Sequence, residues 1–208
     1  MRRPRCVLPA LLALCVVSVC SLSLGEELTR HGSWAAAQAA SRTSGKFIFV
    51  YIYEHNQEGC LAMESTFSDA AVVRALQGYE MLALNGDARQ NREFCEHYRV
   101  GTRYDEGRGG KEDGRMAFAA IPALLFLDYN GREYYRTYGS YAPDTFLLLL
   151  GQVARVIEYQ CALAQRPQDA RVHADLGRLY LEMGRTPLGK PLLETAIKLD
   201  PDNTTGAR

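Results

Sequence analysis

The sequence has no excess of either charge. Its 208 residues include 24 lysines and arginines and 24 aspartates and glutamates, so the formal net charge is zero. A protein that binds nucleic acid is expected to carry a basic face, and the balanced charge gives no reason to expect a nucleic-acid partner. Apolar residues, in contrast, are plentiful. They make up 47% of the chain, which indicates a globular protein rather than a disordered one.

The first 25 residues lack acidic side chains altogether. They begin with the basic stretch MRRPR and continue with an uncharged apolar run, CVLPALLALCVVSVCSLSLG. This order, with small residues at Ser23 and Gly25, predicts a secretory signal peptide that is cleaved before Glu26. An uncleaved membrane anchor is the alternative, because the run is nearly long enough to span a bilayer. We therefore expect an exported protein. It would be periplasmic if bacterial, otherwise in the secretory pathway or secreted, and at a membrane only if the segment stays uncleaved.

Cysteines are few in the exported part of the chain. Three of the six lie in the predicted signal peptide, which leaves Cys60, Cys95 and Cys161. Export would place these thiols in an oxidising compartment. Because three is an odd number, at least one thiol is free or pairs with another molecule.

Apolar runs separated by turn residues predict alternating helices and strands. We expect helices over 33–45, 60–78, 91–100 and 142–167, and strands over 46–53, 79–87, 124–127 and 133–139. Asp69 is a candidate cap that would split the second helix. The last two strands flank Asn130-Gly131, a hairpin turn signal. This order predicts an α/β fold in which helices flank a central mixed sheet, with a hairpin at one edge.

Two further segments lie outside this alternation. Residues 101–120 are rich in glycine and charge and show no apolar period before Met116, which predicts a surface loop. Loops of this length often act as lids or binding loops. Residues 169–203 predict two amphipathic helices joined near Gly184. They resemble one tetratricopeptide repeat, with Gly189 where a small alanine is usual. One repeat cannot bury its own apolar face, so it must pack on the preceding helix, a partner or a second copy.

Three local patterns, in the order of the predicted elements, resemble thioredoxin-like proteins over residues 34–159. They are the set Met63, Glu64, Phe67 and Asp69, the pair Ile121-Pro122 before a buried strand, and the turn Asn130-Gly131 with Gly139 on the last strand. The resemblance implies a redox site in which two cysteines stand three residues apart at the start of a helix. The helix dipole there stabilises the first thiolate, and the second cysteine resolves the mixed disulfide.

This sequence departs from that pattern. The nucleophile position holds Gln57, the resolving position holds Cys60, and the position of the family's buried carboxylate holds Tyr51. A glutamine cannot attack a disulfide, and tyrosine offers no acid–base group near neutral pH. In a slipped register Cys60 would be the nucleophile and Met63 would stand at the resolving position. Cys60 could otherwise form a disulfide with a partner or with Cys95, or serve only as a small buried apolar residue.

The resemblance also implies a cis peptide bond at Pro122. In thioredoxin-like folds the backbone beside that proline pairs with an extended peptide of the client, and this needs no thiol. A trans proline that opens a strand is the alternative. Ile121 and Pro122 are therefore the predicted substrate-binding residues, and the loop 101–120 leads directly into them.

Metal ligands are too scattered to predict a centre. His55, Cys60, Cys95 and His97 match no metal-binding spacing, so we expect no metal and no cofactor. The predicted organisation is a signal peptide over 1–25, a thioredoxin-like domain over 26–160 with a loop insertion at 101–120, and a helical pair with a tail over 161–208.

Two functions remain open at this point. The first is a module that binds an exported protein or extended peptide, with lost or weak disulfide exchange and a second contact surface on the helical pair. The alternative is a thiol-disulfide oxidoreductase acting through Cys60 alone or with Cys95. Whether the protein is an enzyme is therefore left undecided.

Overall fold

The computed structural model describes residues 28–100, 102–104, 115–117 and 121–203. The predicted signal peptide and most of the loop 101–120 lie outside these residues. The strands are β1 (Arg30–His31), β2 (Ile48–Tyr53), β3 (Glu80–Asn85), β4 (Thr102–Tyr104), β5 (Arg115–Ala117), β6 (Ala123–Leu127) and β7 (Glu133–Tyr138). The helices are α1 (Trp34–Ser44), α2 (Glu58–Thr66), α3 (Ala70–Leu76), the short 3₁₀ turn η1 (Arg89–Asn91), α4 (Arg92–Tyr98), α5 (Pro143–Gln165), α6 (Ala170–Glu182) and α7 (Thr186–Leu199).

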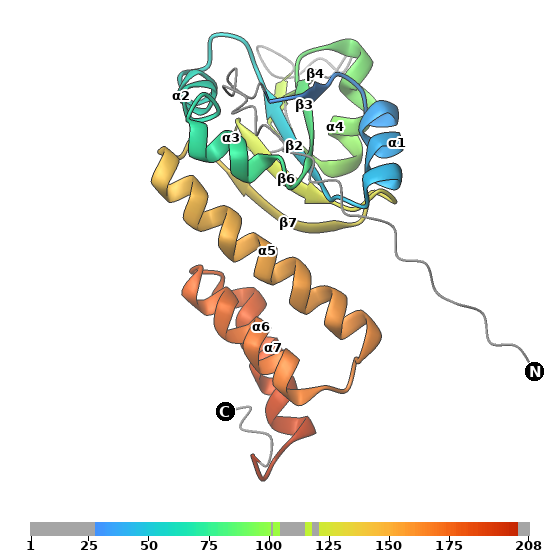
Figure 1. Cartoon of the computed structure of the whole chain (residues 1–208), viewed down its shortest axis with the longest axis vertical. Coiled ribbons are helices and arrows are strands. Elements are labelled where there is room, and N and C mark those ends of the chain that lie inside the picture. Colours follow the sequence, from blue (N-terminus) through green and yellow to red (C-terminus); the bar gives the residue numbers. More distant parts are fainter. Residues whose placement is uncertain (1–27, 101, 105–114, 118–120, 204–208) are drawn as a thin grey trace, which may run out of the picture.

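Five strands form one mixed sheet in the order β1-β3-β2-β6-β7 (Figure 1). Strand β2 runs parallel to β3 and antiparallel to β6, and β7 pairs antiparallel with β6. Helices cover both faces of this sheet, and α6 and α7 form a separate pair beside α5. The predicted α/β class, the mixed sheet and the hairpin at one edge are thereby confirmed.

Strand β2 is apolar at every position. Because successive side chains of a strand point to opposite sides, the sheet is apolar on both faces. From β2, Phe49 and Tyr51 join a cluster with residues of α2, α3 and α5, whereas Val50 and Ile52 face Ala37 of α1 and the end of α4. All of these side chains are fully buried or nearly so. The uninterrupted apolar run in the sequence therefore reflects a strand covered on both sides.

Capping and turn residues lie where the sequence predicted breaks between elements. The Asp69 carboxylate accepts the amides of Ala71 and Val72, so α3 begins separately from α2. Gly45 ends α1 with φ at 73°, in the left-handed region that glycine adopts without strain. In the β6–β7 turn, Gly131 also has positive φ, and a Cβ there would lie 2.8 Å from the Tyr98 hydroxyl.

Two features were not predicted. A short strand, β1, pairs in parallel with β3 at the sheet edge. The prediction of a loop over 101–120 is corrected at both of its ends, since β4 and β5 pair antiparallel there. Strands this short are missed because three residues carry too little apolar alternation to be recognised.

The helical pair packs on α5 with an unusually close crossing of its own two helices. A Cβ on Gly189 would lie only 2.6 Å from the Gly177 carbonyl oxygen, and one on Gly177 would lie 2.8 Å from Leu193. The departure from alanine at Gly189 thus has a physical cause, because no side chain fits between these backbones. The predicted boundary between residues 160 and 161 falls within α5, which runs without a break to Gln165.

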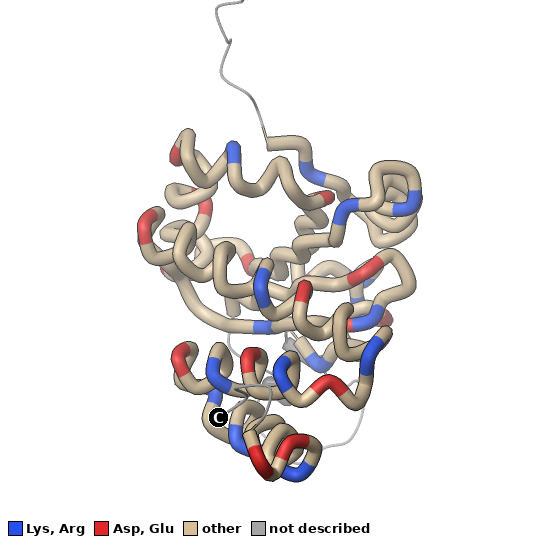
Figure 2. The backbone as a smooth tube through the Cα atoms, turned by 60° about the horizontal axis from the view of Figure 1, so that its bottom comes forward, with Lys and Arg blue, Asp and Glu red and all other residues tan. Residues whose placement is uncertain are grey.

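Lysine and arginine positions are interspersed with aspartate and glutamate positions along the described backbone (Figure 2). In the described part, α5 alone is long and apolar enough to cross a membrane by length and composition. One side of α5 packs into the core, including Phe146, Leu150 and Val153.

Candidate functional site

The turn from β2 into α2 places Gln57 at the helix N-terminus. Asn56 makes this turn with φ at 63°, a conformation that asparagine tolerates better than most residues. Gln57 is the N-cap residue, and its carbonyl accepts the amides of Cys60 and Leu61, each at 3.0 Å. Its side chain makes no capping hydrogen bond and is exposed. The position expected for a nucleophile therefore presents a neutral amide to solvent.

Cys60 lies one turn further and is 4% exposed. Burial raises the pKa of its thiol, although a hydrogen bond from the Glu54 backbone works in the opposite direction. The group therefore stays a thiol near neutral pH, and a thiol is a far weaker nucleophile than a thiolate. Cys60 is free rather than disulfide-bonded.

Tyr51 lies beneath the first turn of α2. Its side chain is fully buried, and its hydroxyl donates to the Cys60 carbonyl at 3.1 Å. Burial raises the pKa of this phenol, with a smaller contribution from Cys60. Tyr51 therefore remains protonated and acts as a fixed hydrogen-bond donor to the helix backbone. It does not exchange protons in the physiological range.

Glu54 is a buried carboxyl group that the sequence interpretation missed. It follows β2 directly, is 8% exposed, and its charge contributes to raising the pKa of Cys60. It acts in the same direction on Cys95, whose pKa is raised to about 11, mainly by burial. The signal was present in the sequence, because an acidic residue ends a six-residue apolar strand. The thioredoxin resemblance instead implies a carboxylate at the position of Tyr51.

The first turn of α2 packs directly against Pro122. The Ile121–Pro122 peptide bond is cis. A Cβ on Gly59 would lie 3.0 Å from the proline Cδ and 3.8 Å from the Ile121 carbonyl oxygen. The structure thus brings together the two predicted parts of the site, 57–60 and 121–122, which are far apart in the sequence. Glycine at position 59 permits the contact.

The two residues of the cis peptide bond differ in burial and in hydrogen bonding. Pro122 itself is buried and its carbonyl accepts the Gly139 amide at 2.9 Å, which begins the β6–β7 ladder. Ile121 is half-buried, and within the part of the chain that the structure describes its amide and carbonyl make no hydrogen bond. Leu61, on the first turn of α2, is 62% exposed. The site therefore offers backbone groups and an apolar side chain.

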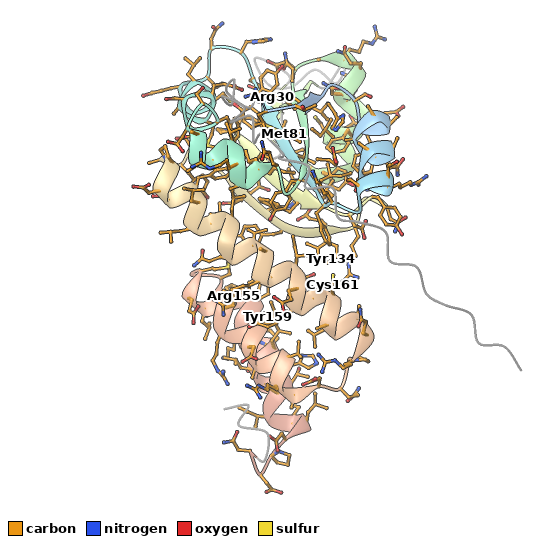
Figure 3. The ribbon with its side chains drawn as sticks, in the orientation of Figure 1. Arg30, Met81, Tyr134, Arg155, Tyr159 and Cys161 are labelled. Atoms are coloured by element: carbon orange, nitrogen blue, oxygen red, sulfur yellow. The ribbon has the colours of Figure 1, made fainter. Side chains whose placement is uncertain are left out.

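The remaining two cysteines lie elsewhere and are also free. Cys95 is buried on α4, in the cluster on the α1 side of the sheet. Cys161 is half-buried on α5, and its sulfur lies 3.8 Å from the Tyr134 hydroxyl on β7 (Figure 3). No disulfide links any described pair.

Histidines near the site make ring contacts. His55 lies edge-on to Tyr53 with centroids 5.6 Å apart, and His97 lies edge-on to Tyr98 at 4.7 Å. Among the described residues, no group of three or more histidine, cysteine, aspartate or glutamate side chains is placed to hold a metal ion.

Comparisons with known proteins show likeness to thioredoxin structures. No protein-family model matches the chain, and no curated protein sequence matches it significantly. A thioredoxin from Thermus thermophilus is 22% identical, covers 62% of this chain and 88% of its own, and has a TM-score of 0.48. A poplar thioredoxin h is 11% identical, covers 61% of this chain and 96% of its own, and has a TM-score of 0.43. The thioredoxin NaTrxh from Nicotiana alata is 16% identical, covers 63% of this chain and 96% of its own, and has a TM-score of 0.42.

At these identities and TM-scores the likeness carries no information about activity. The thioredoxin-like fold rests on the strand order, the mixed strand directions and the placement of α2 against Pro122.

Proposed function

We propose that this protein is an exported thioredoxin-fold module that binds an extended segment of a client protein beside Pro122, with disulfide exchange lost or weak. The observation that carries the proposal is the state of the α2 N-terminus. Gln57 presents an amide where the reaction needs a thiolate, and Cys60 is buried with a raised thiol pKa.

Binding needs only the groups that remain open. An extended peptide pairs through backbone hydrogen bonds and takes specificity from neighbouring side-chain contacts. The half-buried Ile121 supplies the backbone groups, and Leu61 supplies an exposed apolar contact on the adjoining helix. The client is an exported protein on the prediction that residues 1–25 direct export, and the helical pair provides a second surface for a partner.

A thiol-disulfide oxidoreductase is the second candidate. It is supported by the retention of Cys60 as a free thiol and by Glu54, whose charge acts on both Cys60 and Cys95. Against this, the same charge disfavours the thiolate that must attack.

Insulin reduction, measured beside a titration of the thiols, separates the two functions. We expect no turnover for the native chain and slow reaction of Cys60 with a thiol reagent. Turnover that disappears in Cys60→Ser would refute the binding-only proposal. The variant Gln57→Cys tests the geometry, because it restores two thiols three residues apart at a helix N-terminus. It should form a disulfide with Cys60 and gain insulin reduction.

Binding itself is measured with an unfolded protein whose cysteines are carboxymethylated, so that no thiol takes part. We expect Leu61→Glu to weaken capture of this probe. Leu148→Glu is the matched control, because Leu148 is a similarly exposed leucine, 72% accessible, on α5. Equal loss in both variants, or none in Leu61→Glu, would place the binding surface elsewhere.

A further inference from the structure

The outer face of the last helix, α7, carries mainly charged residues and prolines. Along α7 the exposed residues include Pro187, Lys190, Pro191, Glu194 and Lys198, together with Ile197, which is 46% exposed. Charged residues and prolines predominate there, so this face gives little apolar surface on which a further helix could stack. In helical-repeat proteins a terminal repeat with a polar outer face ends the stack. The exposed large apolar side chains of the pair are Leu181, Leu188 and Ile197, and Leu188, the most exposed of them, lies on the flank of α7 that faces α5.

That flank borders a groove. It has a cavity volume of about 520 Å³ and lies between the end of α5 and the first half of α7, with α6 between them. Its lining is Arg132, Gln160, Leu163, Ala164, Leu176, Tyr180, Leu188 and Leu192. Leu176 and Tyr180 of α6 are buried, whereas Leu188 is 52% exposed. A volume between about 300 and 1,000 Å³ with mostly apolar lining is typical of small-molecule sites.

The polar groups of the groove provide proton donors. The Gln160 amide donates to the Tyr134 carbonyl at 2.9 Å and to the Tyr180 hydroxyl oxygen at 2.8 Å. Because that oxygen accepts, the hydroxyl proton is directed elsewhere, and no acceptor for it occurs among the described residues. Tyr180 is only 6% exposed, and burial raises its pKa. It therefore stays a donor at physiological pH.

Arg132 adds a positive charge at the same groove. It follows the β6–β7 turn, and its guanidinium carbon lies 4.8 Å from the centre of the Tyr134 ring. In the described part of the chain this guanidinium forms no ion pair. The stacking on Tyr134 orients the charge without neutralising it. The groove thus combines aliphatic walls, a guanidinium that forms no ion pair with a described residue, and a phenol donor, and its lining contains no carboxylate.

We propose that this groove binds a small apolar monocarboxylate, with the acyl chain along Leu163, Leu188 and Leu192 and the carboxylate toward Arg132 and Tyr180. Charge complementarity selects the anion, since a carboxylate accepts from a guanidinium more strongly than a neutral group does. The size of the groove favours a small molecule over a folded partner. The site is separate from Pro122 and does not depend on the peptide-binding proposal.

The test is calorimetric titration of the full chain with dodecanoate below its micelle concentration. We expect saturable binding of one dodecanoate, and dodecyltrimethylammonium, which has the same chain and the opposite charge, should bind at least about tenfold more weakly. Arg132→Gln should weaken dodecanoate by about tenfold or more for the same reason. Leu188→Gln should weaken both amphiphiles.

Leu148→Gln is the matched control, because it removes an exposed leucine of α5 that is not part of the groove lining, and it should leave dodecanoate binding unchanged. Thermal unfolding of each variant without ligand shows whether the fold is kept. Absence of saturable binding overturns the proposal. So does equal affinity for the cationic amphiphile, or unchanged affinity in a folded Arg132→Gln, because either result means non-specific apolar adsorption.

Discussion

Two regions of this molecule each depend on a glycine at a close contact, but the two contacts have opposite effects on the surface around them. At the start of α2, Gly59 lets the helix touch the Pro122 ring while Gln57 and Leu61 stay exposed beside the contact. In the helical pair, Gly177 and Gly189 bring two backbones together and leave no space between them. The first contact leaves exposed side chains beside it, whereas the second leaves no space between α6 and α7.

The two regions also differ in what surrounds the contact. Around α2, the helix meets Pro122, and Gln57 and Tyr51 occupy the positions where the thioredoxin resemblance implies a thiolate and a carboxylate. In the helical pair, packing is strict along the α6–α7 crossing, and ligand-sized space remains on the flank that faces α5.

The largest effect is expected for Gly189→Ala. The new methyl group would lie 2.6 Å from a backbone oxygen that cannot move without separating α6 and α7. We expect a net destabilisation of about 1–3 kcal/mol, even though alanine is the better helix former. Chemical denaturation measures the change. Gly151→Ala on α5 is the control, because a Cβ there meets nothing within 4 Å, and it should stabilise by about 0.5–1 kcal/mol. Equal effects would contradict the close crossing.

A smaller effect is expected where the helical pair meets the sheet. β7 is an edge strand, and its Tyr134 and Arg136 carbonyls accept from Gln160 and from Arg185, the latter at 3.1 Å. Gln160→Leu combined with Arg185→Ala should cost about 1–2 kcal/mol and speed hydrogen exchange of the β7 amides.

The matched control for these contacts is Arg155→Ala. Arg155 also links α5 to α6, through a 4.0 Å ion pair with Glu182 in which both side chains are more than half exposed. Exposed pairs contribute little to stability, so this variant should leave β7 exchange unchanged. Faster exchange in Arg155→Ala alone would show that the edge is covered by a different set of contacts.

Gly59→Ala should have a still smaller effect on stability. Its methyl group would lie 3.0 Å from the Pro122 Cδ, an atom bonded to the backbone nitrogen, so that α2 has to shift by a few tenths of an ångström. We expect a cost of about 1 kcal/mol or less, with weaker capture of the carboxymethylated probe because α2 moves away from Ile121. Loss of stability as large as that of Gly189→Ala would remove the distinction between the two regions.

The smallest effect concerns Glu54. Its negative charge contributes to the raised pKa of Cys60, but burial is the larger cause. Glu54→Gln should therefore lower the Cys60 pKa and modestly increase its alkylation rate at mildly alkaline pH. Glu58→Gln is the control. Glu58 is exposed on the first turn of α2, which also carries Cys60, and its substitution should leave the alkylation rate of Cys60 unchanged. A slower reaction in Glu54→Gln would mean that the carboxylate assists the thiol.

Much of the fold followed from local patterns. The buried strands, the break at Asp69 and the turn at Gly131 could be predicted because each depends on neighbouring residues alone. Strand β1 could not, because two residues form a strand only when β3 offers an edge. The burial of Glu54 was missed for a related reason, since burial depends on elements that pack over the strand from elsewhere in the chain.

The sequence by itself determined the α/β alternation and the absence of a cysteine at position 57, since residue identity and apolar period are local properties. Only the tertiary structure decided that Gly59 meets Pro122, that Gly189 meets Gly177, and that Arg132 shares a groove with α5, α6 and α7. Contacts between distant segments depend on how whole elements cross. No window of the sequence contains that information.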